Sequence, residues 1–287
     1  MISLLRSDLY RAWHRSDGFW NCMLAIVGIV CVLVGLSWFT MQHGNVMLAS
    51  IENDAGKGVV GFVGTPSAPT YLWSQTTVTS SFLGFLCACL ALYNVGNDFS
   101  GGFARTYLSS VRGRVTYLIE KFVLAGVMSA IAMVVAIVAA TIGLLVAGFR
   151  FSGADSVAFV LAWLACVWLT CWAVASVVVA IMLSLRSMAI GILWVFAVAG
   201  GGVEGVLQLL ALPVAWGLGT DAPIRAVETF NSWLPTANYA LLNATAPAGN
   251  VLAVPGGSLV HAAVCSLGLI AACVAIVVAT QRRHDVA

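Results

Sequence analysis

Residues 122–148 read FVLAGVMSAIAMVVAIVAATIGLLVAG, a run without a single charged side chain. A helix needs about 20 apolar residues to cross the roughly 30 Å hydrocarbon core of a bilayer, so this run predicts a membrane-spanning helix. The sequence therefore predicts an all-α membrane protein with six transmembrane helices in one domain, residues 1–287. The six predicted spans cover approximately residues 18–40, 77–96, 122–148, 157–184, 188–212 and 258–280.

The composition of the 287 residues excludes several other classes of protein. Hydrophobic residues make up 61% of the chain and charged residues 8%, whereas about 25% of the residues of a soluble domain are charged. The net charge of +2 leaves no basic surface for nucleic acid, so we expect no nucleic-acid partner.

No catalytic or metal-binding motif is recognisable in the sequence. Glycine precedes lysine only at Gly56-Lys57, and the residues around this pair do not form a P-loop. The eight cysteines lie inside apolar runs, where they can pack as small hydrophobic side chains, and the four histidines are scattered. We therefore expect no enzyme activity in this chain and no catalytic, cofactor-binding or metal-ligating residues.

The distribution of Lys and Arg predicts the orientation in the membrane, because cytoplasmic loops carry an excess of both. Placing the N-terminus inside puts ten of the 13 Lys and Arg residues on the cytoplasmic side. Only Lys57, Arg150 and Arg225 then lie outside. Both termini are therefore predicted to be cytoplasmic.

The segment before the first span, MISLLRSDLYRAWHRS (1–16), has apolar residues at near-helical spacing with three arginines between them. This pattern favours an amphipathic helix lying in the inner membrane interface. The alternative is an ordinary positively charged flank that fixes the topology. The residues predicted to lie at the interface are Arg6, Arg11, Trp13 and Arg15.

The connection at 97–121, NDFSGGFARTYLSSVRGRVTYLIEK, is the longest predicted on the cytoplasmic side. Gly101-Gly102 should end the helix of the second span. Residues 103–108 can then form a short helix along the membrane surface, with an apolar side that includes Phe103, Tyr107 and Leu108. The alternative is a charged loop that satisfies the positive-inside rule.

Two features of the second half of the chain are also informative. Residues 213–257 are apolar and rich in proline, which favours a re-entrant segment in the outer leaflet or a small extracellular cap. Glu204 follows three glycines inside the fifth predicted span. A carboxylate at this depth is costly and usually faces a cavity or a partner. Alternatively, Glu204 reaches the outer headgroups or is protonated and hydrogen-bonded within the bundle.

The layout and the 97–121 connection together resemble the permease subunits of ABC-2-type ABC transporters. The resemblance rests on Asn97-Asp98-Phe99, Gly101-Gly102, Leu108-Ser109, Arg114 and Lys121, which occur in the order typical of that family. Phe103 departs from the pattern, because the family more often has Thr or Ser after the glycine. The compact six-span form is similar to permeases of peptide-antibiotic export and self-immunity.

The resemblance implies a plasma-membrane subunit that binds no cofactor directly and exports an amphiphilic compound or peptide antibiotic. ATP is hydrolysed by a separate ATP-binding subunit, which receives the short helix of the connection in a groove. A second permease chain, identical or related, completes the substrate path within the lipid bilayer. The residues implied in ATPase coupling are Asp98, Gly101, Gly102, Phe103, Arg105, Tyr107, Leu108, Arg114 and Lys121.

Two other functions fit the same sequence. An ion- or proton-coupled carrier could use Glu204 as its coupling group. Such carriers often consist of two similar halves, and residues 1–148 and 149–287 show no convincing repeat. The third possibility is a structural membrane anchor or assembly factor.

Overall fold

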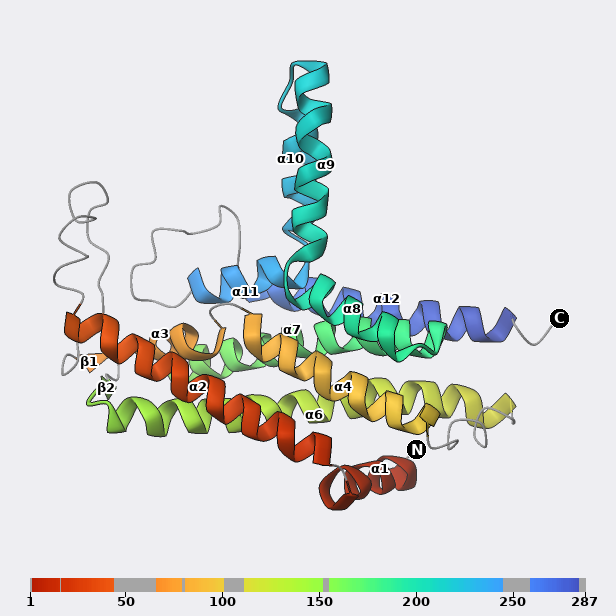
Figure 1. Cartoon of the computed structure of the whole chain (residues 1–287), viewed down its shortest axis with the longest axis horizontal. Coiled ribbons are helices and arrows are strands. Elements are labelled where there is room, and N and C mark those ends of the chain that lie inside the picture. Colours follow the sequence, from red (N-terminus) through yellow and green to blue (C-terminus); the bar gives the residue numbers. More distant parts are fainter. Residues whose placement is uncertain are drawn as a thin grey trace.

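A computed structural model gives the fold of most of the chain (Figure 1). Within the described residues, the elements are helices apart from one short parallel strand pair, β1 (Pro66–Ser67) with β2 (Arg150–Phe151). The prediction of an all-α membrane protein is confirmed at this level. The structure describes residues 2–15, 17–43, 66–78, 81–100, 111–151, 155–244 and 259–283.

Five long helices run alongside one another and form a bundle (Figure 1). Each contains a stretch that is long and apolar enough to cross a membrane, and a bent pair of shorter helices makes a sixth if it is counted as one span. The five long helices are α2 (Asp17–His43), α4 (Phe82–Ser100), α6 (Val111–Val146), α7 (Val157–Leu185) and α12 (Leu259–Arg283).

The core of the bundle lies around α7, which packs against α4, α6 and α12. On α6 the buried side chains Ala132, Ala136 and Ala140 recur at every fourth position. Residues at this spacing share one helix face. Small residues on such a face allow membrane helices to approach closely.

Two helices differ in extent from the predicted spans. The second span was predicted to begin at residue 77, but η2 (Ser74–Val78), a π-helical turn, precedes α4, and Ser81 has a φ of 57°. α4 and α6 also extend well into the predicted 97–121 connection, to Ser100 and from Val111. The reason is that Tyr117 and Leu118 are fully buried, so the apolar face of α6 begins before the uncharged run.

The predicted span at 188–212 is not one straight helix. α8 (Met188–Ala199) and α9 (Gly202–Leu218) meet at a bend of 68°. Gly201 has a φ of +73° at this break. That backbone conformation favours glycine, so the glycines noted in the sequence end one helix and start the next.

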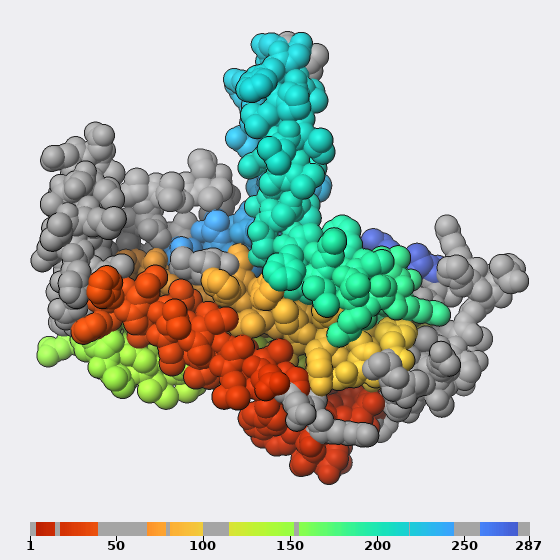
Figure 2. All heavy atoms as spheres, viewed as in Figure 1, coloured from red at the N-terminus to blue at the C-terminus, as the bar shows by residue number. Residues whose placement is uncertain are grey.

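Beyond the bend, α9 and α10 (Ala222–Asn231) form a hairpin that projects away from the bundle (Figures 1 and 2). Its exposed residues include Leu209, Leu210 and Trp216. α11 (Pro235–Ala244) then returns to pack against α7 and α12. Residues 245–258, the rest of the predicted outer segment, lie outside the described residues.

Two short helices complete the described elements. α1 (Ile2–Arg15) packs against α6 at the end of the bundle where α4 ends (Figure 1). α3 (Pro69–Trp73) precedes η2. The short helix predicted at 103–108 lies outside the described residues.

Candidate functional site

Charged side chains from three helices meet in a buried ion network near the C-terminal end of α4. Its members are Asp8 and Arg11 of α1, Asp98 of α4, and Glu120 and Lys121 of α6. Asp8 and Lys121 are 113 residues apart in the sequence. The network therefore joins α1 to two helices, α4 and α6, that lie much later in the chain.

Lys121 is the centre of the network, with a side chain that is only 1% exposed. Its Nζ atom forms ion pairs with Asp8 and, at 2.5 Å from Oδ2, with Asp98. The same Nζ lies 3.4 Å from Oε2 of Glu120. One ammonium group thus serves three carboxylates on three helices.

Arg11 is the second cation of the network and is about one-third exposed, at 34%. It forms an ion pair with Asp8, one turn away, and its Nη1 atom lies 3.4 Å from Oδ1 of Asp98. Tyr117 adds a hydrogen bond, donated by its hydroxyl to Oδ2 of Asp98 over 3.2 Å. Asp98 is therefore held by two cations and one hydroxyl.

The positions of these residues follow from helix periodicity. Leu4, Asp8 and Ala12 are buried and lie four residues apart, so they share the face of α1 that is turned toward the bundle. Tyr117 and Lys121 have the same spacing on α6. An ionised side chain buried on such a face is costly unless it is paired with an opposite charge and hydrogen-bonded.

The charges shift the pKa values of the two α1 residues. Burial opposes ionisation of Asp8, but the charges and hydrogen bonds of Lys121 and Arg11 outweigh it, so the pKa of Asp8 lies below its usual value. Burial likewise disfavours the charged form of Arg11, yet the hydrogen bond and charge of Asp8 raise its pKa. Both groups are therefore ionised at neutral pH.

Glu120 is the least compensated member of the network. Its side chain is fully buried. Neither of its carboxylate oxygens has a hydrogen-bond partner among the described residues, which leaves the nearby Lys121 ammonium. Among the described side chains the network thus holds three carboxylates against two cations, and loss of Lys121 would penalise Glu120 most.

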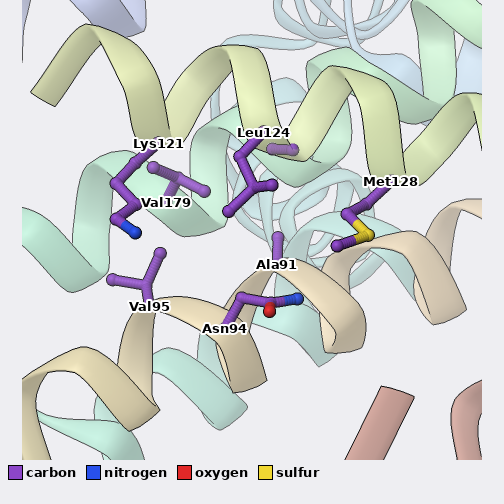
Figure 3. Close-up of a pocket in the computed structure, with 8 residues that line it drawn as sticks. Ala91, Asn94, Val95, Lys121, Leu124, Met128 and Val179 are labelled. Carbon is purple, nitrogen blue, oxygen red and sulfur yellow. The ribbon is translucent and has the colours of Figure 1, made fainter. Parts of the chain in front are cut away.

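A small cavity adjoins the network between α4, α6 and α7 (Figure 3). Its volume of about 10 Å³ is at the lower limit for a single water molecule. Lys121 and Asn94 are the polar side chains of its lining. The amide of Asn94 donates a hydrogen bond to the carbonyl of Leu90 over 2.8 Å. This cavity is too small for a substrate.

The structure brings together some of the residues implied in ATPase coupling. Asp98 and Lys121 form a direct ion pair, and Arg114 belongs to α6, although its side chain is not described. The other implied residues, Gly101, Gly102, Phe103, Arg105, Tyr107 and Leu108, lie outside the described residues.

The four residues predicted at the interface all belong to α1, with different surroundings. Arg6 and Trp13 are exposed, and the side chain of Arg15 is not described. Arg11 instead turns to the ion network and pairs with Asp8 and Asp98. Arg11 lies one helical turn after Asp8 and pairs with it, whereas Arg6 is exposed.

Sequence reasoning missed Asp8, Tyr117 and Glu120 as members of the site. A signal was present for Asp8, because it shares a helix face with Leu4 and Ala12, where an acid needs a buried cation. Glu120 precedes Lys121 directly and also enters the apolar face of α6. The partners could not be named, because pairing between helices is not encoded in local spacing.

Glu204 lies apart from the network, in the first turn of α9. It accepts a hydrogen bond from the hydroxyl of Thr236, in α11. Its side chain lines a cavity beside the bend between α8 and α9.

Among the described residues there is no group of His, Cys, Asp and Glu that could hold a metal ion, and the cysteines are free.

The chain matches no protein-family model and no curated protein sequence. Its function is therefore inferred from the arrangement of its own residues, above all from the ion network that joins α1, α4 and α6.

Proposed function

We propose that this chain is the permease subunit of an ATP-driven exporter that resembles ABC-2-type ABC transporters. The cargo is an amphiphilic compound or a peptide antibiotic, and a separate ATP-binding subunit hydrolyses ATP. The observation that carries the proposal is that an ion pair joins α4 and α6, the two helices that residues 101–110 connect in the sequence. Asp98 precedes this segment on α4, Lys121 follows it on α6, and the two form an ion pair.

This arrangement suits the transmission of force from a docked partner to the spans. In the proposal, residues 103–108 dock on the ATP-binding subunit and move when it closes on ATP. Removing one partner of a buried ion pair strongly destabilises a protein. Separating Asp98 from Lys121 would likewise be costly, so α4 and α6 should move together. Asp8 and Arg11 extend the same unit to α1.

The proposed orientation places α1 and the ion network on the cytoplasmic side of the plasma membrane, together with both chain termini. The bent pair α8–α9 is then counted as the fifth of six spans, and α10 and α11 belong to the re-entrant segment of the outer leaflet. A second permease chain, identical or related, completes the path. The excess of Lys and Arg in the connections of this side supports the orientation.

An ion- or proton-coupled carrier remains the second candidate, favoured by the bend at Gly201. Carriers often place substrate and ion sites where a membrane helix is interrupted. Glu204 lines a cavity at such an interruption. It is the carboxylate of that lining, and the volume of this cavity is about 180 Å³, compared with about 10 Å³ for the cavity beside the ion network.

The test is association with an ATP-binding protein. The affinity-tagged chain is purified from its native membranes, and co-purifying proteins with a P-loop are identified by mass spectrometry. The double variant Arg105→Glu/Tyr107→Ala removes a charge and an aromatic contact from the docking segment. Interface residues of this kind often contribute about 2 kcal/mol or more each, so recovery of the ATP-binding protein should fall at least tenfold.

The matched control changes an exposed arginine and an exposed aromatic residue in the α9–α10 hairpin, Arg225→Glu/Phe230→Ala. It should leave the association unchanged, because the hairpin lies away from the ion network (Figure 1). Equal recovery of the ATP-binding protein with the docking variant and the control would contradict the proposal.

A further inference from the structure

The bend between α8 and α9 leaves an apolar cavity with one carboxylate in its lining. Its volume is about 180 Å³. Side chains of five helices contribute, because α7, α11 and α12 pack around the break in addition to α8 and α9. Apart from Glu204 and Thr236, the lining side chains are apolar or aromatic, and Trp194 is among them.

The carboxylate of Glu204 is held in place by neutral donors. The hydroxyl of Thr236 and the backbone N–H of Ala237 donate hydrogen bonds to it. Its place in the first turn of α9 also favours a negative charge, because the N-terminal end of a helix carries a partial positive charge. No cation pairs with Glu204 among the described residues, in contrast to the network at α1.

The half-buried carboxylate therefore lacks the partner that a charge in apolar surroundings requires. A cation that brings its own apolar group would satisfy both parts of the cavity at once. Trp194 adds an aromatic side chain of the type that attracts cations. An engineered apolar cavity of about 150 Å³ accommodates a benzene molecule, so the space here suits one ring or a short alkyl chain.

We infer that this cavity binds the cationic end of an amphiphile, with an ammonium group at Glu204 and an adjoining ring or alkyl group among the apolar side chains. The inference rests on the proposed export function, for which it names the chemical class of the cargo. A neutral or anionic amphiphile lacks the charge that complements Glu204, so the cavity discriminates against both. The rest of a larger cargo extends beyond the cavity.

Benzylammonium is a suitable probe, and benzyl alcohol, with nearly the same shape and no charge, is its reference. Binding to the full chain in nanodiscs of zwitterionic lipid is measured at neutral pH by equilibrium dialysis, with empty nanodiscs subtracted. Neither ATP nor an ATP-binding subunit is present. The wild-type chain should bind benzylammonium at least tenfold more tightly than benzyl alcohol, because hydrogen bonds to charged groups are roughly twice as strong as neutral ones.

Two variants test separately the charge of Glu204 and the volume of the cavity. Glu204→Gln should abolish the tenfold preference, whereas Glu228→Gln, which removes an exposed carboxylate from α10, should preserve it. Ala197→Phe fills the cavity but leaves Glu204 in place, and it should weaken the binding of both probes. A retained preference in Glu204→Gln, or wild-type binding no greater than that of empty nanodiscs, would overturn the inference.

The result is independent of ATP coupling. A failure of benzylammonium to bind leaves the association with an ATP-binding protein untouched, and it overturns only the assignment of the cavity. A chain that binds benzylammonium but recruits no ATP-binding protein retains the cavity as a cation site and loses the proposed energy source.

Discussion

Replacing Lys121 by methionine is expected to destabilise the protein severely. Methionine preserves an unbranched side chain of similar length but removes the ammonium group. That group is within ion-pair distance of Asp8, Asp98 and Glu120, and its side chain is 1% exposed. The substitution therefore leaves three buried carboxylates with Arg11 as the remaining cation of the network.

The magnitude follows from the partners that remain. Arg11 still contacts Asp8 and Asp98, so each of these keeps one cation. Glu120 keeps none among the described residues and must be protonated or hydrated. Removing one partner of a buried ion pair typically costs about 3–5 kcal/mol. We expect the free energy of unfolding to fall by about this amount.

Unfolding is measured by titrating SDS into mixed micelles and following tryptophan fluorescence. Arg225→Met is the matched control, because it also removes a cation in favour of methionine, at an exposed position of α10. A surface change of this kind usually alters stability by no more than about 0.5 kcal/mol. If Lys121→Met costs no more than this control, the ion network does not hold the helices together.

A triple variant separates lost charge balance from lost packing. Asp98→Asn and Glu120→Gln, added to Lys121→Met, leave Asp8 and Arg11 as a balanced pair. Replacing a whole buried ion network by neutral groups is often tolerated, unlike the removal of one partner. The triple variant should recover at least half of the lost stability. Failure to recover would assign the effect to packing alone.

Three further predictions test other parts of the molecule. The pKa of Asp8 is lowered in the folded state, so its contribution to stability is complete above its unfolded value of about 4 and is lost as the pH falls below that; Asp8→Asn should remove this acid dependence from unfolding curves measured between about pH 2 and 6. Glu204→Leu should impair folding more than Glu204→Gln, because glutamine can still accept the hydrogen bond of Thr236; equal losses of stability in detergent unfolding curves of the two variants would contradict this structural role of the hydrogen bond. Gly84→Ala should destabilise by about 1–3 kcal/mol through overpacking, because the new methyl group would clash with the hydroxyl of Tyr239, whereas Gly28→Ala, with nothing within 4 Å, should not; equal losses of thermal stability of the two variants in detergent would contradict this.

The long helices could be predicted because their evidence is local. A run such as 122–148 has no charge to place in lipid, so its length alone indicates a span. The glycines at 200–202 could be noted, but not the 68° bend, which lies at the end of a helix, α8, that packs against α4, α7 and α11. Helix rotation and bending are set by neighbouring helices, which hydropathy does not describe.

The candidate site was predictable only in part. Asp98 and Lys121 were named through their places in the motif that resembles ABC-2-type permeases, and the structure pairs them. Asp8 gave only a weak local signal, because its partner Lys121 is distant in the sequence. A charged residue on an apolar helix face predicts a buried partner of opposite charge. Which residue is that partner depends on the tertiary packing.

The central proposal, that this chain couples to an ATP-binding subunit through the 101–110 segment, is tested most directly by the rate of ATP hydrolysis in the purified complex. The measurement compares the wild-type chain with Arg105→Glu/Tyr107→Ala and with the hairpin control Arg225→Glu/Phe230→Ala. We predict ATP hydrolysis that co-purifies with the wild type and the control and falls at least tenfold with the docking variant. Absence of ATP hydrolysis from the wild-type preparation, or an equal rate with the docking variant, would contradict the proposal.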